Sequence, residues 1–192
     1  KYVEGYVSGP ISNDLLFRVA GKFSDVNGWI KNVAQPIFNP FYGVNSPGPA
    51  TGDAPAYKSY SGRVTLKWNP GSDFDATFKF SANHLCGNGD DAIEAFCGAP
   101  ASNVGKVSVL NILTGQQIYD PNSDCKLDKR RSQGALPSNV LTNWPGARDG
   151  RTYNKLDALI GSLALNYHLG DMTLSSISGY TKLKARNLGM YD

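Results

Sequence analysis

Apolar and polar residues alternate strictly along several stretches of the chain. From position 60 to 69 the even-numbered residues are apolar or glycine and the odd-numbered ones are polar, and the same holds from 74 to 83. Because successive side chains of a β-strand point to opposite faces, this period of two predicts strands with one face in an apolar medium. The turn-forming residues at 69–73, between the two stretches, predict a hairpin.

Two further hairpins are predicted, one near each end of the chain. The alternation is clear in the first pair and weaker in the last, where its character changes near Ile177, a change typical of a bulge or a rim. The six predicted strands cover residues 2–9, 15–27, 59–69, 73–84, 155–168 and 171–187.

The connections between the hairpins are long, whereas the turns within them are short. Residues 28–57 and 85–152 are rich in Gly, Pro, Asn and Ser, and loops of this length are usually functional. The pattern predicts an all-β fold: an antiparallel transmembrane β-barrel segment of about six strands in three hairpins, with short periplasmic turns and two long extracellular loops. A soluble all-β carbohydrate-binding module, whose strands also alternate, is an alternative.

The polar positions of the strands favour the membrane interpretation. They carry basic side chains that suit a water-filled lumen, whereas the opposite positions hold only apolar residues and glycine through the middle of the strands. The residues predicted to face the lumen are Arg18, Lys22, Arg63, Lys67 and Lys79.

Composition narrows the function classes. The 192 residues include 21 glycines, 18% charged and 11% aromatic residues, which favours β structure with many turns. A net charge of +3 is too small to indicate nucleic-acid binding. No nucleophile motif such as G-x-S-x-G is present, so we expect no enzyme and no catalytic residues.

Three segments resemble the barrel of TonB-dependent outer-membrane receptors. Residues 4–21 carry EGYVSGPISNDLLFRVAG, similar to the family's "G-x-V-S-G-P-L-S-D" turn and "R-x-A" strand, and NGWIKN at 27–32 resembles its "D-G-Y-x-x-N" strand end. GRVTLKWNP at 62–70 is similar to "G-R-x-x-L-x-W-x-P". YHLGDMTLSSISGY at 167–180 resembles "W-x-L-G-D-F-T-L-T-S-I-T-G-Y".

The resemblance implies active uptake of a scarce nutrient, such as an iron-siderophore, across the outer membrane of a Gram-negative bacterium. Such receptors resemble a barrel of twenty-two strands closed around a plug domain that contacts the TonB complex. The implied partners are the plug, the TonB complex, outer-membrane lipid and lipopolysaccharide, and a small-molecule nutrient. With six strands, no plug and an end at Asp192, the chain is expected to be an internal barrel fragment. A passive porin is the other membrane alternative, since it needs no plug.

Ligand contacts are expected in the long loops, where aromatic rings can stack on a siderophore or a sugar and arginines can meet an anion. The candidates are Trp29, Phe41, Tyr42, Arg130, Arg131 and Trp144.

The three cysteines lack the paired spacing of a zinc site. In an oxidising outer-surface loop we expect a disulfide between Cys86 and Cys97, with Cys97–Cys125 as the rival pairing. Acidic residues between the first two cysteines are weak candidates for Ca²⁺ ligands, although their spacing fits no calcium loop. They are Asp90, Asp91 and Glu94. No cofactor is expected.

Overall fold

The computed structural model forms two compact units. It describes residues 1–36, 38–39, 43–45, 47–88, 108–110, 117–119, 127–142 and 145–189. The first unit, here the sheet unit, comprises residues 1–25, 58–86 and 155–185. The second, the loop unit, comprises residues 26–57, 87–154 and 186–192. Each unit is described by itself below.

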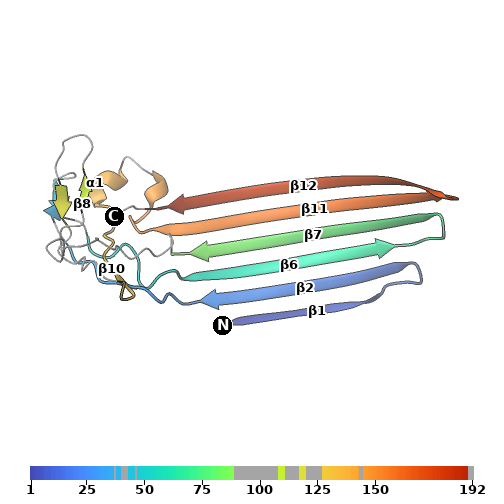
Figure 1. Ribbon diagram of the computed structural model, residues 1–192, viewed down its shortest axis with the longest axis horizontal. Helices are drawn as coiled ribbons and strands as arrows, with labels where there is room; N and C mark the ends of the chain where they lie inside the picture. The colour runs from blue at the N-terminus through green and yellow to red at the C-terminus, as the bar shows by residue number, and fades with distance from the viewer. Residues whose placement is uncertain are drawn as a thin grey trace. The chain divides into compact units, whose positions relative to one another are not determined.

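The long strands form one six-stranded sheet in the order β1-β2-β6-β7-β11-β12 (Figure 1). Strands that follow each other in this order run in opposite directions, so the prediction of an all-β fold with six strands in three antiparallel hairpins is confirmed. The strands are β1 (Tyr2–Pro10), β2 (Leu15–Val26), β6 (Tyr57–Trp68), β7 (Phe74–Gly87), β11 (Tyr153–Leu169) and β12 (Met172–Leu188).

The boundaries agree closely with the sequence-based expectation. The largest difference is in β7, which continues to Gly87 where the alternation predicted an end at 84. β12 runs without interruption from Met172 to Leu188, through the position where a rim was expected. Both long connections, now residues 27–56 and 88–152, leave the same end of the sheet, and the three short turns lie at the other end.

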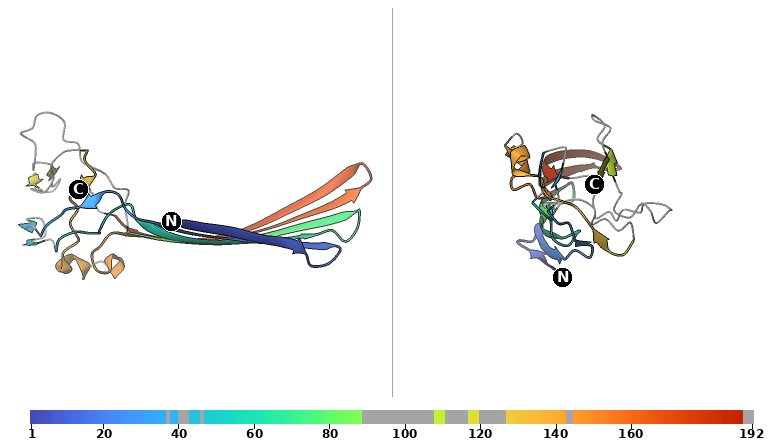
Figure 2. Two further views of the ribbon diagram at one scale, coloured as in Figure 1. Left: turned by 90° about the horizontal axis from the view of Figure 1, so that it is seen from below. Right: turned by 90° about the vertical axis from the view of Figure 1, so that its left-hand side faces the viewer.

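The sheet is twisted and open (Figure 2). In the first hairpin Val3 lies opposite Phe23 and Val7 opposite Val19, which fixes the register. β1 and β12 are the two outer strands, and each has a hydrogen-bonded neighbour on one side within this sheet. The sheet therefore does not close, and each outer strand presents a row of backbone groups able to pair with another strand.

The loop unit is built from very short elements. β3 (Lys31–Asn32) pairs in parallel with β10 (Arg130–Arg131), so the two long connections contact each other. The other elements are β4 (Phe38–Asn39), β5 (Val44–Asn45), β8 (Ser108–Leu110), β9 (Gln117–Tyr119), the one-turn helix α1 (Ser138–Leu141) and the 3₁₀ turn η2 (Pro145–Ala147). Within the described residues no helix has the length and apolar character needed to cross a membrane.

A small core and one asparagine hold the loop unit together. Ile30, 1% exposed, is the largest fully buried side chain among the described residues. The Asn32 side chain donates hydrogen bonds to the carbonyl oxygens of Thr51 and Gln133 and accepts one from the Gln133 backbone N–H at 3.1 Å. It thereby replaces regular strand pairing between segments 101 residues apart.

Gly150 is predicted to be essential for this packing. Its φ is +79°, and a Cβ there would lie 2.5 Å from the carbonyl oxygen of Leu136. We expect Gly150→Ala to destabilise the loop unit by about 1–3 kcal/mol, measured as faster hydrogen exchange of the Leu136 amide, which donates to the Gly150 carbonyl. Gly146→Ala is the control, because a Cβ added at Gly146 would have no neighbouring atom within 4 Å. Equal effects of the two substitutions would contradict this role.

Candidate functional site on the two faces of the sheet

One face of the sheet, the apolar face, carries the apolar positions of the alternating strands. It contains the even-numbered residues of β6 and β7, as the contact between the rings of Trp68 and Phe74 indicates, with centroids 5.7 Å apart. The ring of Phe23 on β2 packs on Tyr60 of β6 at 5.0 Å, so the odd-numbered residues of β2 share this face. The face is therefore continuous across neighbouring strands.

A groove of about 350 Å³ lies on the apolar face. It is lined by residues of four strands: Leu15, Leu66, Trp68, Ala76, Phe78 and Leu163. These side chains are half-buried or exposed although they are apolar, and Phe78 is 39% exposed. An apolar surface of this kind is normally covered by a partner or a membrane.

The length of the apolar face matches a lipid bilayer. Phe74 and His84 lie on this face near its two ends, ten residues apart in β7. Ten residues of strand rise about 33 Å, which corresponds to a height of about 25 Å at a tilt of about 40°. Aromatic residues lie at both ends, with Phe23 and Tyr60 near the long connections and Trp68 and Phe74 near the short turns. Outer-membrane barrels have an apolar band of this height with aromatic girdles at both edges.

The opposite face, here the polar face, carries the basic residues predicted to line a lumen. The guanidinium of Arg18 lies 4.0 Å from the ring centre of Tyr6, and Lys22 forms an ion pair with Glu4 at 3.5 Å. Lys67 on β6 shares this face with Asp75 on β7 by the alternation of the two strands. Arg63 and Lys79 share this face by the alternation of β6 and β7.

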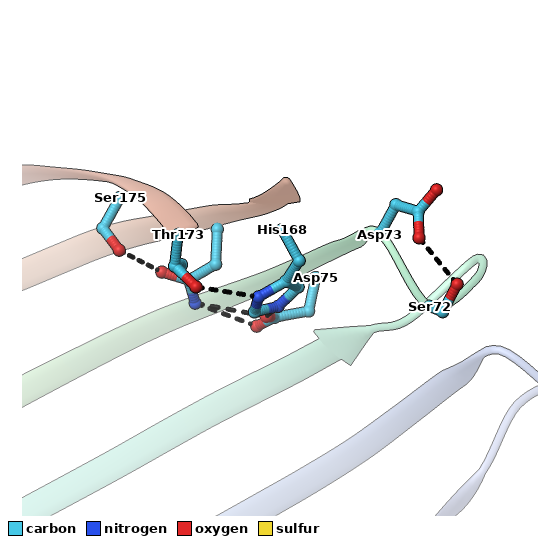
Figure 3. A network of polar contacts seen from close by, with 7 residues as sticks. Ser72, Asp73, Asp75, His168, Thr173 and Ser175 are labelled. Carbon is cyan, nitrogen blue, oxygen red and sulfur yellow. Dashed lines mark hydrogen bonds and ion pairs between the residues drawn. The ribbon is translucent and has the colours of Figure 1, made fainter. Parts of the chain in front are cut away.

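A polar network crosses three strands near the short turns of the polar face (Figure 3). Asp75 on β7 accepts hydrogen bonds from the side-chain amide of Asn166, at 3.1 and 3.2 Å, and lies 3.2 Å from His168 Nε2. His168 Nδ1 lies 3.1 Å from the Thr173 hydroxyl, and Ser175 donates to Asn166. Asp75 therefore connects β7 to β11, and the two β11 residues connect onward to β12.

The order Thr173, His168, Asp75 is that of a nucleophile, a base and an acid in hydrolases. Two observations favour a structural role instead. Asp75 is shared with Asn166, which does not belong to such a triad, and the His168 side chain is 42% exposed to solvent. The network connects three strands at the polar face. The other histidine, His84, lies on the apolar face and pairs with Asp157. His84 and His168 therefore lie on opposite faces of the sheet.

The polar face also carries exposed aliphatic side chains on β11 and β12, a feature that was not predicted from the sequence. The even-numbered residues of β11 and the odd-numbered residues of β12 lie on the polar face, as the contact between Asn166 and Ser175 shows. They include Ile160, Ile177 and Leu183, whose side chains are 45%, 80% and 64% exposed. Ser176 and Ser178, on either side of Ile177, occupy positions of the apolar face. In this part of β12 polar residues lie on the apolar face and aliphatic residues on the polar face, so the alternation of the strand was hard to interpret from sequence.

The loop candidates for ligand contact fall into three groups. Trp29 is 58% exposed and Arg130 is exposed, so both side chains are accessible to a ligand. Arg131 is 6% exposed, and its guanidinium donates to the Thr51 hydroxyl at 2.9 Å, so it contributes to the packing of the loop unit. Phe41, Tyr42 and Trp144 lie outside the described residues.

The cysteine and metal predictions fall mostly on parts of the chain that the structure does not describe. Cys86 is half-buried, whereas Cys97 and Cys125 lie outside the described residues, so the pairing stays a prediction. The same is true of the weak calcium candidates Asp90, Asp91 and Glu94. Within the described ranges no group of three or more His, Cys, Asp or Glu residues is placed to hold a metal ion.

The chain matches no family model, no curated protein and no solved structure. Its function is therefore inferred from the two faces of the sheet and from the residues themselves.

The network of Asp75 is predicted to hold the β11–β12 hairpin on β7. Asp75→Ala removes the acceptor that Asn166 and His168 share, so we expect faster hydrogen exchange of the β11 backbone at 166–168. Asp73→Ala is the matched control, because the side chain of Asp73 accepts a hydrogen bond from Ser72 of the same turn. Unchanged exchange in Asp75→Ala, or the same increase in both variants, would show that the network does not hold the strands.

Proposed function

We propose that the chain is a segment of the barrel wall of an outer-membrane TonB-dependent receptor, which takes up a scarce nutrient such as an iron-siderophore. The observation that carries the proposal is the two-faced sheet: one apolar face about as high as a bilayer core, and one face with charged residues and polar networks. The resemblance of the three hairpin segments to this receptor family further implies that the nutrient moves into the cell and that the TonB complex supplies the energy.

The open edges of the sheet support a larger closed assembly. A membrane-spanning sheet must pair all of its backbone groups, because lipid offers no hydrogen-bonding partner. β1 and β12 each have one neighbour in this sheet, so further strands are required on both sides if the sheet crosses a membrane. This requirement agrees with a receptor barrel of many strands, of which these six form a part.

The inner surface of the wall favours a plugged receptor over a passive porin. A porin lumen is filled with water and lined by polar residues. Ile160, Ile177 and Leu183 are exposed aliphatic side chains on the polar face, and their exposure to water is unfavourable. A plug domain packed against β11 and β12 removes these side chains from water, while the basic residues of β2, β6 and β7 meet polar plug residues or solvent.

The soluble carbohydrate-binding module is less consistent with the apolar face. A soluble sheet buries its apolar face against a second layer of the same fold. Trp68, Phe78 and Leu163 instead line an open groove, and Tyr60 is 52% exposed. Lipid as the covering medium accounts for these exposed side chains.

Nutrient capture is assigned to the loop unit. Trp29 presents an exposed ring, and Arg130 presents an exposed guanidinium on the strand that pairs with β3. An aromatic ring and a cation together suit a siderophore that carries aromatic groups and negative charge. The nutrient then passes inward when the TonB complex acts on the plug.

The proposal is tested on the full-length protein in its native envelope. We expect it to stay with the outer membrane after a carbonate wash and to support nutrient uptake that stops when the proton gradient is dissipated. Uptake that persists without the gradient would indicate a porin. Release by carbonate would indicate a soluble module.

Matched substitutions on adjacent residues test which face meets lipid. Val64 lies on the apolar face and Thr65 on the polar face of the same strand, and both side chains are half-buried. We expect Val64→Arg to lower the stability of the assembled protein by about 2–4 kcal/mol and Thr65→Arg to cost less. The measurement is reversible unfolding from vesicles of phosphatidylcholine.

Phe78→Arg and Lys67→Glu give an independent pair for the same test, on β7 and β6. We expect the first to impair assembly and the second to be tolerated better. The reverse ranking in either pair would mean that the assignment of the two faces is wrong.

A further inference from the structure

Most basic residues of the polar face gather around one threonine. The backbone N–H of Asn69 donates to the carbonyl oxygen of Asp14 at 2.8 Å, which fixes the register of β6 on β2. Four residues inward from this bond on each strand, Thr65 lies opposite Arg18. The ring contact between β2 and β6 described above fits the same register. Arg18 is therefore a direct neighbour of Thr65 across the sheet.

A lysine lies on the other side of Thr65. The backbone N–H of Asn88 donates to the carbonyl oxygen of Ala56 at 3.0 Å, which fixes the register of β7 on β6. Nine residues inward from this bond on each strand, Lys79 lies opposite Thr65. The ring contact between β6 and β7, with centroids 6.2 Å apart, fits the same register. Thr65 therefore has a basic residue on each neighbouring strand.

Two more cations lie on the same strand as Thr65. Arg63 and Lys67 are two residues away in either direction, so they share its face at about 7 Å along the strand. Thr65 is half-buried, whereas each of the four surrounding basic residues is exposed. Their long, flexible side chains can all reach a group held above Thr65. We call Arg18, Arg63, Lys67 and Lys79 the cation cluster.

Carboxylates do not balance the cation cluster within the described residues. The strands of the polar face carry two of them, Glu4 and Asp75. Glu4 forms its ion pair with Lys22, which is not part of the cluster. Asp75 lies diagonally across from Lys67, and its printed partners on β11 include His168. One shared carboxylate near four cations leaves most of the positive charge unbalanced.

An aromatic ring holds one of these cations in place. The guanidinium of Arg18 lies 4.0 Å from the ring centre of Tyr6, a contact that leaves its charge and the N–H groups at its edge available. Like charges on neighbouring strands repel each other, so the grouping costs stability unless an anion lies among them. The arrangement therefore suits an anion with several negative charges.

The neighbouring part of the polar face indicates what reaches the cation cluster. β11 and β12 carry exposed aliphatic side chains, such as Ile160 and Ile177, and the plug of the proposed receptor would pack against them. The wall at β2, β6 and β7 is then left beside water. Fixed charges that border water concentrate dissolved ions of the opposite sign.

We propose that the cation cluster binds the nutrient on its way through the lumen, and that the nutrient is a polyanion whose charge lies on oxygen atoms, as in carboxylates or phosphates. This inference rests on the proposed function, since it needs the polar face to line a lumen. It adds a substrate class and a site on the barrel wall to the loop residues that capture the nutrient. The guanidinium and ammonium groups bind the anionic oxygens, and the Thr65 hydroxyl lies between them as a further donor.

Cysteine modification measures the charge that a dissolved molecule meets at the cluster. Thr65→Cys is made in the full-length protein without its native cysteines, in native membranes. Its reaction rate is compared for two thiol reagents of similar size, the anionic sulfonatoethyl and the cationic trimethylammonioethyl methanethiosulfonate. Thr181→Cys is the matched control, on the polar face of β12, three strands from β6. That separation is about 14 Å, beyond the screening length of about 8 Å at physiological ionic strength. We expect the anionic-to-cationic rate ratio to be at least about tenfold higher at position 65 than at position 181.

Occupation of the cluster is tested with citrate, a tricarboxylate, against its neutral triethyl ester. We expect citrate to slow the reaction of Thr65→Cys with the anionic reagent and the ester to leave the rate unchanged. In the same chain, a variant that removes three cluster charges is expected to lose this protection and to show the rate ratio of position 181: Arg18→Gln, Arg63→Gln and Lys79→Gln. A matched control removes three charges elsewhere and is expected to keep both properties: Lys155→Gln, Lys182→Gln and Lys184→Gln. Unchanged reaction of Thr181→Cys shows that each variant is folded.

Three results would overturn the inference: equal rate ratios at the two positions, no protection by citrate, or retention of both properties by the cluster variant. The same reactions separate this inference from the proposed function. If both positions react without a preference for the anionic reagent, the lumen exists and the anion site alone is wrong. If neither position reacts while Val64→Cys does, the polar face does not line a lumen and the proposed function is wrong as well.

Discussion

The alternation of side chains along paired strands is the constraint on which the rest of this structure depends. It divides the sheet into a face of exposed apolar residues, such as Phe78 and Leu163, and a face with charges and a network centred on Asp75. The membrane that we propose on the apolar side would account for the exposed groove and for the aromatic residues at both ends. The open edges at β1 and β12 then require further strands.

The polar face is not uniform, and its two parts indicate different neighbours. On β2, β6 and β7 it carries cations that are partly balanced by Glu4 and Asp75. On β11 and β12 it carries exposed aliphatic residues, of which Ile177 is the most exposed. In the receptor that we propose, a plug would cover the aliphatic side chains and leave water beside the charged ones.

The sequence predicted the sheet well because its signal is local. Strict alternation in β6 and β7 and the turn residues at 69–73 defined a hairpin without any long-range contact. The loop unit was not predicted, because strands of two residues have no period and the Asn32–Gln133 contact joins positions 101 residues apart. The buried position of Arg131 was missed for the same reason. In β12 the faces exchange character, and only its pairing with β11 shows which face each residue occupies.

The central claim, that the apolar face lies in lipid, is tested most directly by a spin-label scan of β6 in the full-length protein in membranes. Single cysteines at positions 58 to 68, in a background without native cysteines, would each carry a nitroxide whose collisions with oxygen and with a water-soluble nickel chelate are measured. We predict high oxygen accessibility at even positions from Tyr60 to Trp68 and higher nickel accessibility at odd positions from Ser61 to Lys67. Equal accessibility at both sets, or the opposite phase, would contradict it.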